Sequence, residues 1–270
     1  MKFEVVIQAH LRSLTKSELK VANYVLENSQ KVLYQTLQEL SKETNVGEAT
    51  VMRFCNKIGC DKFASLKLMI AQEAPKEDEK VASNLIEAIE IDLCNIIHNT
   101  SLILDESSVE AAVDIIYKAK RIHFFGVGSS GLSALEAETN FMRIGIHSKA
   151  VSDPHFQIMA ASTFTSDDAV IAFTLSGSTK DIFDSCSVAK QAGAQIIVVT
   201  NYVNSPISKL ADCVLLTAAK EHIMQGGTLG GTISQLFVID ALKEKYIAKN
   251  KAKILKLRAK VAESLVPKTL

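Results

Sequence analysis

Val170-Ile-Ala-Phe-Thr-Leu-Ser-Gly-Ser-Thr179 is the segment of this chain that most clearly indicates its fold. Its apolar, β-branched first half predicts a buried strand, and its second half is a short turn before a helical pattern. Four residues of the turn carry hydroxyl groups, namely Thr174, Ser176, Ser178 and Thr179. Gly177 lets the backbone approach a ligand, and the N–H groups at the start of the next helix would point at the same place. Two interpretations remain open here: a phosphate site, or a connection in which Ser and Thr only cap the helix.

The sequence around this stretch alternates between strand and helix patterns. Strands are predicted at Ile122–Gly126, Ser148–Val151, Ala169–Leu175, Gln195–Thr200 and Val214–Thr217. Helices are predicted at Leu132–Ile144, Phe156–Phe164, Thr179–Ala192, Ser205–Ala211 and Thr232–Ala248, after two earlier ones at Val81–Leu104 and Ser107–Ala119. Apolar strands that alternate with helices predict a doubly wound, parallel α/β sheet.

A second turn of the same kind follows the first predicted strand. Within Phe124-Phe-Gly-Val-Gly-Ser-Ser-Gly131, Gly128, Ser129 and Ser130 form the connection to the next helix. The spacing resembles the start of a dinucleotide fingerprint, but the two serines suit a phosphate monoester or a sugar better than a pyrophosphate. We therefore expect no nucleotide cofactor. Both turns follow strands of one parallel sheet, where ligands collect, so together they favour a real site.

The N-terminal 74 residues are predicted to be entirely helical. Thr15 and Glu18 match a capping box at the start of one helix, and Phe63–Ile70 suggests another. Between them, a helix at Leu37–Thr44 with Thr36 as its N-cap, a tight turn ending at Gly47, and a helix at Glu48–Ile58 have helix-turn-helix spacing.

The second helix of this unit would present its outer face to a DNA major groove. The predicted DNA-facing residues are Glu48, Ala49, Thr50, Arg53 and Lys57. Arg53 could bind guanine through two hydrogen bonds, whereas Thr50 and Lys57 suit phosphates or a thymine methyl group. Val51, Phe54 and Ile58 would face the core. The alternative is a small helical bundle that contacts protein.

The charge of the chain is unevenly distributed, although 30 Lys and Arg residues balance 30 Asp and Glu residues. Residues 1–74 carry 10 basic and 8 acidic residues, residues 75–242 carry 11 and 20, and residues 243–270 carry 9 and 2. An acidic middle disfavours a membrane surface, and a mildly basic N-terminal part is compatible with nucleic acid. No apolar run has membrane-spanning length and the N-terminus lacks a signal-peptide pattern, so we expect a cytoplasmic protein.

The cysteines do not form a recognisable pattern. They are Cys55, Cys60, Cys94, Cys186 and Cys213. Their odd number and scattered spacing predict buried, reduced thiols and no zinc site.

The two halves of the chain resemble two known modules. Residues 1–75 resemble the helix-turn-helix domain of RpiR-type bacterial transcriptional regulators, through Leu40-Ser-x3-Asn-Val-x-Glu-Ala-Thr-Val-x-Arg-Phe-Cys-x-Lys-Ile-Gly59. Residues 112–251 resemble the sugar isomerase (SIS) domain, through the two serine-rich turns, Asp153-x-His155, Asp168, Glu221 and Ser234-Gln-Leu-x4-Asp-Ala-Leu242.

The resemblance implies an all-α helix-turn-helix domain (residues 1–75), a linker and connecting helices (76–111), a flavodoxin-like SIS domain (112–251) and a basic C-terminal helix (252–270). It further implies a regulator of sugar or amino-sugar metabolism. Its partners would be an operator in double-stranded DNA, a sugar phosphate effector and further copies of the chain in a homodimer or homotetramer.

Two departures from the family pattern affect the expected sites. Gly47 replaces a serine N-cap, and the segment Gln225-Gly-Gly-Thr-Leu-Gly-Gly231 lacks the arginines that relatives often carry there. Glu221 would accept a sugar hydroxyl in a regulator, or act as the base of an aldose–ketose phosphate isomerase, which is the alternative function. A helix-turn-helix domain favours the regulator, because an isomerase has no use for one.

Overall fold

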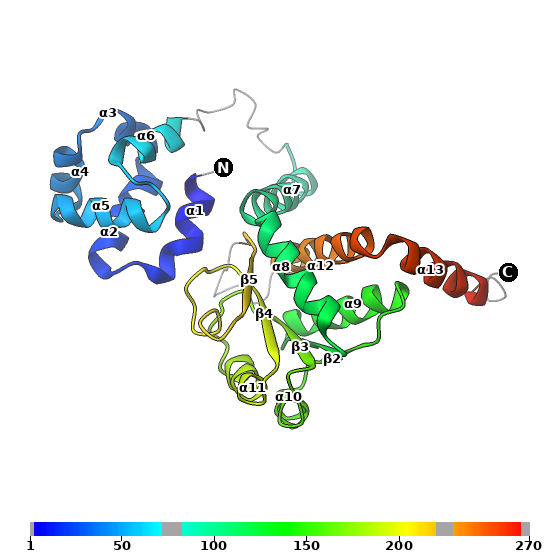
Figure 1. Ribbon diagram of the computed structural model, residues 1–270. Coiled ribbons are helices and arrows are strands. Elements are labelled where there is room, and N and C mark those ends of the chain that lie inside the picture. Colours follow the sequence, from blue (N-terminus) through cyan, green and yellow to red (C-terminus); the bar gives the residue numbers. More distant parts are fainter. Residues whose placement is uncertain (1–2, 72–82, 220–228, 266–270) are drawn as a thin grey trace.

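Within residues 3–71, 83–219 and 229–265, which the computed structural model describes, a parallel sheet of five strands forms the centre of the larger part of the protein (Figure 1). The strands are β1 (Arg121–Phe125), β2 (Ser148–Val151), β3 (Asp168–Phe173), β4 (Gln195–Thr200) and β5 (Cys213–Leu216). Their order is β2-β1-β3-β4-β5, and neighbouring strands pair in parallel. This order is that of the doubly wound, flavodoxin-like fold predicted from the sequence.

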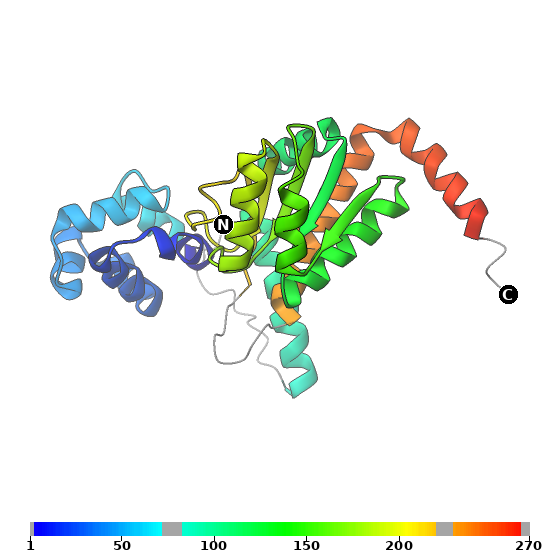
Figure 2. The ribbon, with the colours of Figure 1, turned by 90° about the horizontal axis from the view of Figure 1, so that it is seen from below.

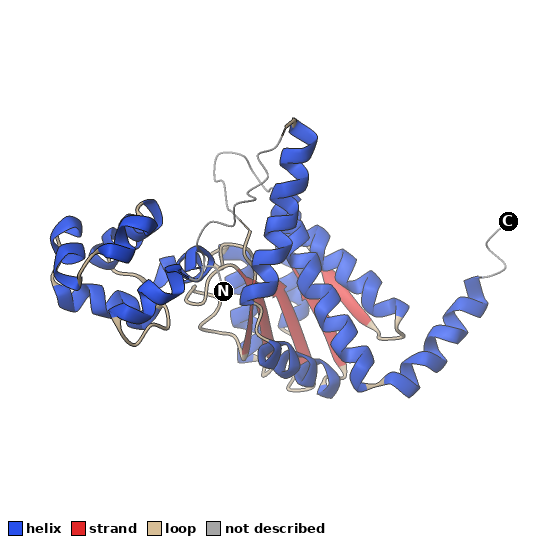
Figure 3. Cartoon of the chain, turned by 90° about the horizontal axis from the view of Figure 1, so that it is seen from above, coloured by secondary structure: helices blue, strands red, loops and turns tan. Residues whose placement is uncertain are grey.

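Helices cover both faces of the sheet (Figure 2). One face packs against α8 (Glu106–Lys118), α9 (Ser129–Arg143) and α12 (Leu229–Lys249), and α7 (Leu85–Ile103) packs on α12. The other face packs against α10 (Pro154–Ala161) and α11 (Lys180–Gln191). α13 (Lys251–Leu265) follows α12 and points away from the sheet (Figure 3).

Strand β3 shows why the sequence forms this three-layer arrangement. All of its residues are buried. Ile171 and Phe173 belong to the core under α8, α9 and α12, whereas Val170 and Ala172 belong to the core under α11. Successive side chains point to opposite faces of a strand, so an uninterrupted apolar run is stable only in a central strand covered on both sides.

The N-terminal part is a bundle of helices with its own core. Its elements are α1 (Phe3–His10), the 3-10 turn η1 (Leu11–Ser13), α2 (Lys16–Glu27), α3 (Ser29–Tyr34), α4 (Leu37–Thr44), α5 (Glu48–Lys57) and α6 (Phe63–Ala71). Val21, Leu40 and Phe54 are completely buried in this core. Thr15 and Thr36 begin α2 and α4 with complete capping boxes, so the ends of these helices are fixed by their own sequence.

The observed elements differ from the predicted ones in a few places. Residues 206–210 form turns instead of the predicted helix Ser205–Ala211, because the N–H groups of Leu210 and Ala211 bond to carbonyl groups only three residues earlier. The start of the expected linker, residues 76–82, lies outside the described residues. α1 and α3, with 8 and 6 residues, lie in the region predicted to be helical, but they were not predicted as individual helices.

Candidate functional site

The two serine-containing turns lie side by side at the carboxyl edge of the sheet. Residues 126–128 follow β1, residues 174–179 follow β3, and these two strands pair directly. β2 lies on the other side of β1, so successive strands are added on opposite sides of β1, and the strand order reverses between β1 and β3. Open parallel sheets bind ligands in the crevice outside the strand ends at such a reversal.

The backbone of the turn after β3 fits only glycine at residue 177. Gly177 has a φ of +59°, and a Cβ atom there would lie 2.2 Å from Oγ of Ser205 and 3.0 Å from Oγ1 of Thr200. The loop after β4 also holds the turn by hydrogen bonds: Thr200 Oγ1 donates to the Leu175 carbonyl at 3.0 Å, and the Ile207 N–H donates to the Gly177 carbonyl at 3.2 Å. The turn is therefore a rigid, preformed feature.

The hydroxyl groups of this turn occupy different positions. Thr174 is buried, with its Oγ1 atom 3.3 Å from Oγ1 of Thr179. Ser176 accepts a hydrogen bond from the N–H of Ser178, which is exposed. Thr179 is the N-cap residue of α11, yet its side chain makes no capping hydrogen bond to that helix. The first N–H groups of α11 and the Ser176 and Ser178 hydroxyls thus form a donor-rich turn suited to an anion.

The turn after β1 is built by close packing against α9 and α12. Gly128 begins α9 with a φ of +57°, and a Cβ atom on Gly126 would lie 2.2 Å from the Ser130 carbonyl oxygen. Ser129 is half-buried, whereas Ser130 is buried and accepts a hydrogen bond from Gln235 Nε2 at 3.0 Å. The structure therefore brings together the residues predicted in both turns. Glu221 and most of the predicted glycine-rich segment lie outside the described residues.

The helix-turn-helix unit has the predicted helices, α4 and α5, joined by a tight turn. Asn45 adopts the left-handed conformation, with a φ of +51°, and the Ser41 carbonyl accepts a hydrogen bond from the Val46 N–H at 3.1 Å. Gly47 is the N-cap residue of α5 and has open space around the position of a Cβ atom. Val51, Phe54 and Ile58 are buried, as predicted. The opposite face of α5 is thus the free one.

The predicted DNA-facing residues differ in what they offer to a ligand. Glu48 and Ala49 are exposed, and 65% of the Arg53 side chain is accessible. Thr50 is buried and accepts a hydrogen bond from Arg53 Nη2 at 2.9 Å, so it orients the guanidinium group. Thr36 uses its hydroxyl in its capping box.

Glu18 of α2 holds the predicted residue Lys57, a contact that the sequence did not reveal. Lys57 Nζ lies 2.7 Å from Oε2 of Glu18 and also donates to the Ser13 carbonyl at 2.8 Å. Burial opposes ionisation of Glu18, but hydrogen bonds from Lys57 and Thr15 hold its pKa below the ordinary value. The only sequence signal for Glu18 was its place in the capping box.

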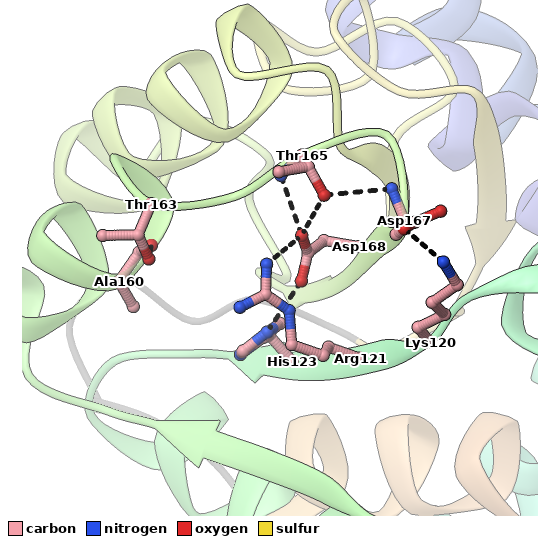
Figure 4. A network of polar contacts seen from close by, with 8 residues as sticks. All are labelled: Lys120, Arg121, His123, Ala160, Thr163, Thr165, Asp167 and Asp168. Carbon is pink, nitrogen blue, oxygen red and sulfur yellow. Dashed lines mark hydrogen bonds and ion pairs between the residues drawn. The ribbon is translucent and has the colours of Figure 1, made fainter.

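A buried charged network lies at the opposite, amino edge of the sheet (Figure 4). Asp168 has no exposed side-chain surface, and its Oδ2 atom accepts hydrogen bonds from Arg121 Nη2 at 2.7 Å and the Thr165 N–H at 2.8 Å. Burial opposes ionisation of Asp168, but these donors keep its pKa below the ordinary value. Burial lowers the pKa of His123, which stacks on Phe164. The network joins the starts of β1 and β3 and so supports the sheet from the end away from both turns.

Other kinds of site find little support in the described residues. Among them, no group of three His, Cys, Asp or Glu side chains could hold a metal ion. Burial raises the pKa of Cys186 to about 12, so this thiol stays protonated. Cys94 on α7 is exposed, contrary to the prediction that the cysteines are buried. No described helix combines the length and apolarity needed to span a membrane.

Comparisons with known proteins identify both parts of the chain. Residues 1–77 match the helix-turn-helix domain of the rpiR family, and residues 115–245 match the SIS domain. The chain is 35% identical over 244 residues to an uncharacterised HTH-type transcriptional regulator of Haemophilus influenzae, over 86% of this chain and 85% of that protein. It is 28% identical over 272 residues to the regulator HexR of Escherichia coli, over 96% of this chain and 92% of HexR.

The fold also resembles solved structures. The Vibrio vulnificus NanR protein, complexed with ManNAc-6P, aligns over 99% of both chains with a TM-score of 0.66 and 24% identity. The sugar isomerase domain of an RpiR transcription factor from Sphaerobacter thermophilus covers 66% of this chain and 98% of that domain, with a TM-score of 0.61 and 18% identity. The fold and the helix-turn-helix unit define the class, that of HTH-type transcriptional regulators with a SIS domain. Within this class, the chain belongs to the RpiR family.

Proposed function

We propose that this regulator binds an operator through α5 and that a phosphorylated sugar, bound between the turns after β1 and β3, controls its operator affinity. The observation that carries the proposal is the preformed turn at residues 174–179, where Gly177 fits against Ser205 and the Thr179 side chain does not cap the first N–H groups of α11. Its place at the switch point of the sheet supports a ligand there. NanR, which shares this fold, was solved with ManNAc-6P, and this supports a sugar phosphate as the ligand class.

On the DNA side, we propose that Arg53 reads a guanine while Glu48 and Ala49 lie against the base edges or the DNA backbone. Gly47 would allow the backbone at the start of α5 to approach a phosphate, since no neighbouring atom occupies the space beside it. In this proposal Thr50 and Lys57 position the helix, and Thr36 fixes the start of α4. A cytoplasmic homodimer, alone or within a homotetramer, would present two α5 helices to half-sites about one helical turn, or a multiple of it, apart.

The protein senses the sugar phosphate in this proposal and does not convert it. An isomerase needs a positioned acid–base pair at the sugar. The two described turns supply hydroxyl and amide groups instead, and their Ser130 hydroxyl is bound to Gln235. HexR and the Haemophilus influenzae relative, which align with this chain over 92% and 85% of their lengths, are both named as transcriptional regulators.

The test is fluorescence anisotropy with DNA from upstream of the protein's own operon, with and without a panel of amino-sugar, hexose and pentose phosphates that includes ManNAc-6P. We expect an affinity that falls steeply with salt and changes with one class of sugar phosphate. The double variant Ser130→Ala, Ser176→Ala should bind DNA but lose the response, whereas Ser162→Ala, on the exposed end of α10, should behave as wild type. Sugar phosphate turnover without DNA binding would show instead that the protein is an isomerase.

A further inference from the structure

Arg12 of the N-terminal part reaches the turn after β3. It lies in η1, and its Nη1 atom donates a hydrogen bond to the hydroxyl of Ser178. Its guanidinium carbon is 4.4 Å from the centre of the Tyr202 ring, in the loop after β4. The backbone beside it is attached to the same loop, because the Val203 N–H donates to the Ala9 carbonyl at 3.1 Å. η1 and this loop lie beside each other at the junction of the two parts of the protein (Figures 1 and 2).

This contact brings a fixed positive charge to a turn that otherwise offers hydroxyl and amide groups. Lys180, the nearest cation along the chain, is ion-paired with Asp184. The planar guanidinium group matches a phosphate geometrically, and a charge-assisted bond to phosphate is stronger than a bond to a neutral hydroxyl. The ring of Tyr202 favours the cation at this place. Arg12 is therefore already positioned where a phosphate bound by Ser176 and Ser178 would lie.

The segment η1 is also bound to α5. The carbonyl of Ser13, the residue after Arg12, accepts a hydrogen bond from Lys57 at the end of α5. Lys57 is also paired with the buried carboxylate of Glu18 in α2. Hydrogen bonds of Arg12 and Ser13 therefore connect Ser178 of the SIS domain to Lys57 at the end of α5. A displacement of η1 would therefore also move α5, the helix proposed to face DNA.

We propose that Arg12 is a ligand of the effector phosphate, supplied to the SIS domain by the DNA-binding part of the chain, and that the phosphate acts on α5 through it. This inference rests on the proposed function. When a phosphate binds at residues 176–179, the guanidinium group exchanges the Ser178 hydroxyl for phosphate oxygens. The resulting displacement of η1 changes the position of α5 relative to the SIS domain, and so changes operator affinity.

The first test is calorimetric titration of the full chain with ManNAc-6P and with inorganic phosphate. Arg12→Ala should weaken binding of a phosphorylated probe about tenfold or more, as loss of a charge-assisted bond predicts. Arg12→Lys should recover part of the affinity, because it keeps the charge but not the planar fork. Lys16→Ala is the matched control, because Lys16 is an exposed cation at the start of α2, and it should bind as wild type. Melting curves check that each variant is folded.

The second test compares operator affinity with and without a saturating probe. Wild type should show a difference of fivefold or more, and Arg12→Ala should show less than twofold even when the probe saturates it. If Arg12→Ala binds and responds as wild type while Ser130→Ala, Ser176→Ala does not, the inference is wrong and the proposed function stands. If wild type binds neither these probes nor any sugar phosphate of the panel, the inference and the proposed function both fail.

Discussion

A single methyl group at residue 177 should destabilise the SIS domain and remove the proposed sugar phosphate site. In Gly177→Ala, the positive φ of +59° costs about 1–2 kcal/mol for an L-residue. The new Cβ atom would lie 2.2 Å from Oγ and 2.4 Å from Cβ of Ser205, so the loop after β4 must move. Such overpacking typically costs about 1–3 kcal/mol. The total of about 2–5 kcal/mol should lower the melting temperature by roughly 5–15 °C in a domain of this size.

Gly193→Ala separates the two contributions. Gly193 also has a positive φ, +97°, but the nearest atom to its Cβ position is 3.4 Å away, which is ordinary contact. This variant should therefore lose only the conformational part, about 1–2 kcal/mol. Melting curves followed by circular dichroism measure both changes, and calorimetry should show that Gly193→Ala keeps its sugar phosphate affinity while Gly177→Ala loses at least tenfold. Equal melting temperatures for the two variants would refute the close approach at Gly177.

Three further predictions concern the DNA-binding part. Arg53→Ala should weaken operator binding by about 1–3 kcal/mol and relax specificity at one base pair, measured by anisotropy on operator variants; an unchanged affinity would exclude base contact. Gly47→Ser should add a side-chain cap to α5 and raise the free energy of unfolding by roughly a few tenths of a kcal/mol. A decrease would mean that the space beside Gly47 is occupied. Glu18→Gln should lower that free energy by about 1 kcal/mol at neutral pH. Because the pKa of Glu18 is lowered on folding, the stability difference between wild type and Glu18→Gln is present above about pH 4.5 and should vanish as the pH falls through the folded-state pKa. Chemical unfolding at pH 7 and pH 3 measures this difference. A difference that stays constant with pH would contradict the ion pair.

Much of the fold could be predicted because its signals are local. The central strands of a parallel sheet, which are buried on both faces, are continuous apolar runs, and Gln195–Thr200 was predicted with the bounds that the structure has. The edge strand Ser148–Val151 was also predicted with its observed bounds. α3 could not be predicted in this way, because a helix of 6 residues owes its stability to packing and not to its own periodicity. The turn at 206–210 likewise has apolar residues at helical spacing but forms other hydrogen bonds.

The site was predictable where chemistry and backbone geometry coincide in one short segment. The glycine and the hydroxyl groups of residues 174–179 predict the turn, and the pairing of β1 with β3 places it beside Gly128. The contacts between distant segments left no such signal. Arg12 and Ser178 are 166 positions apart, and Glu18 meets Lys57 only because α2 packs on α5. The helical period put Thr50 on the outer face, but it lies at the border of the buried stripe and is covered.

Titration of the sugar phosphate into the free protein and into its operator complex measures the coupling between the effector site and the DNA-binding site. If one protein carries both sites and they are coupled, the effector affinities must differ between the two titrations by the same factor by which the effector changes operator affinity. We expect a shared factor of at least fivefold, in line with typical coupling free energies. Equal effector affinities for free and operator-bound protein would contradict the claim that the turns after β1 and β3 control DNA binding.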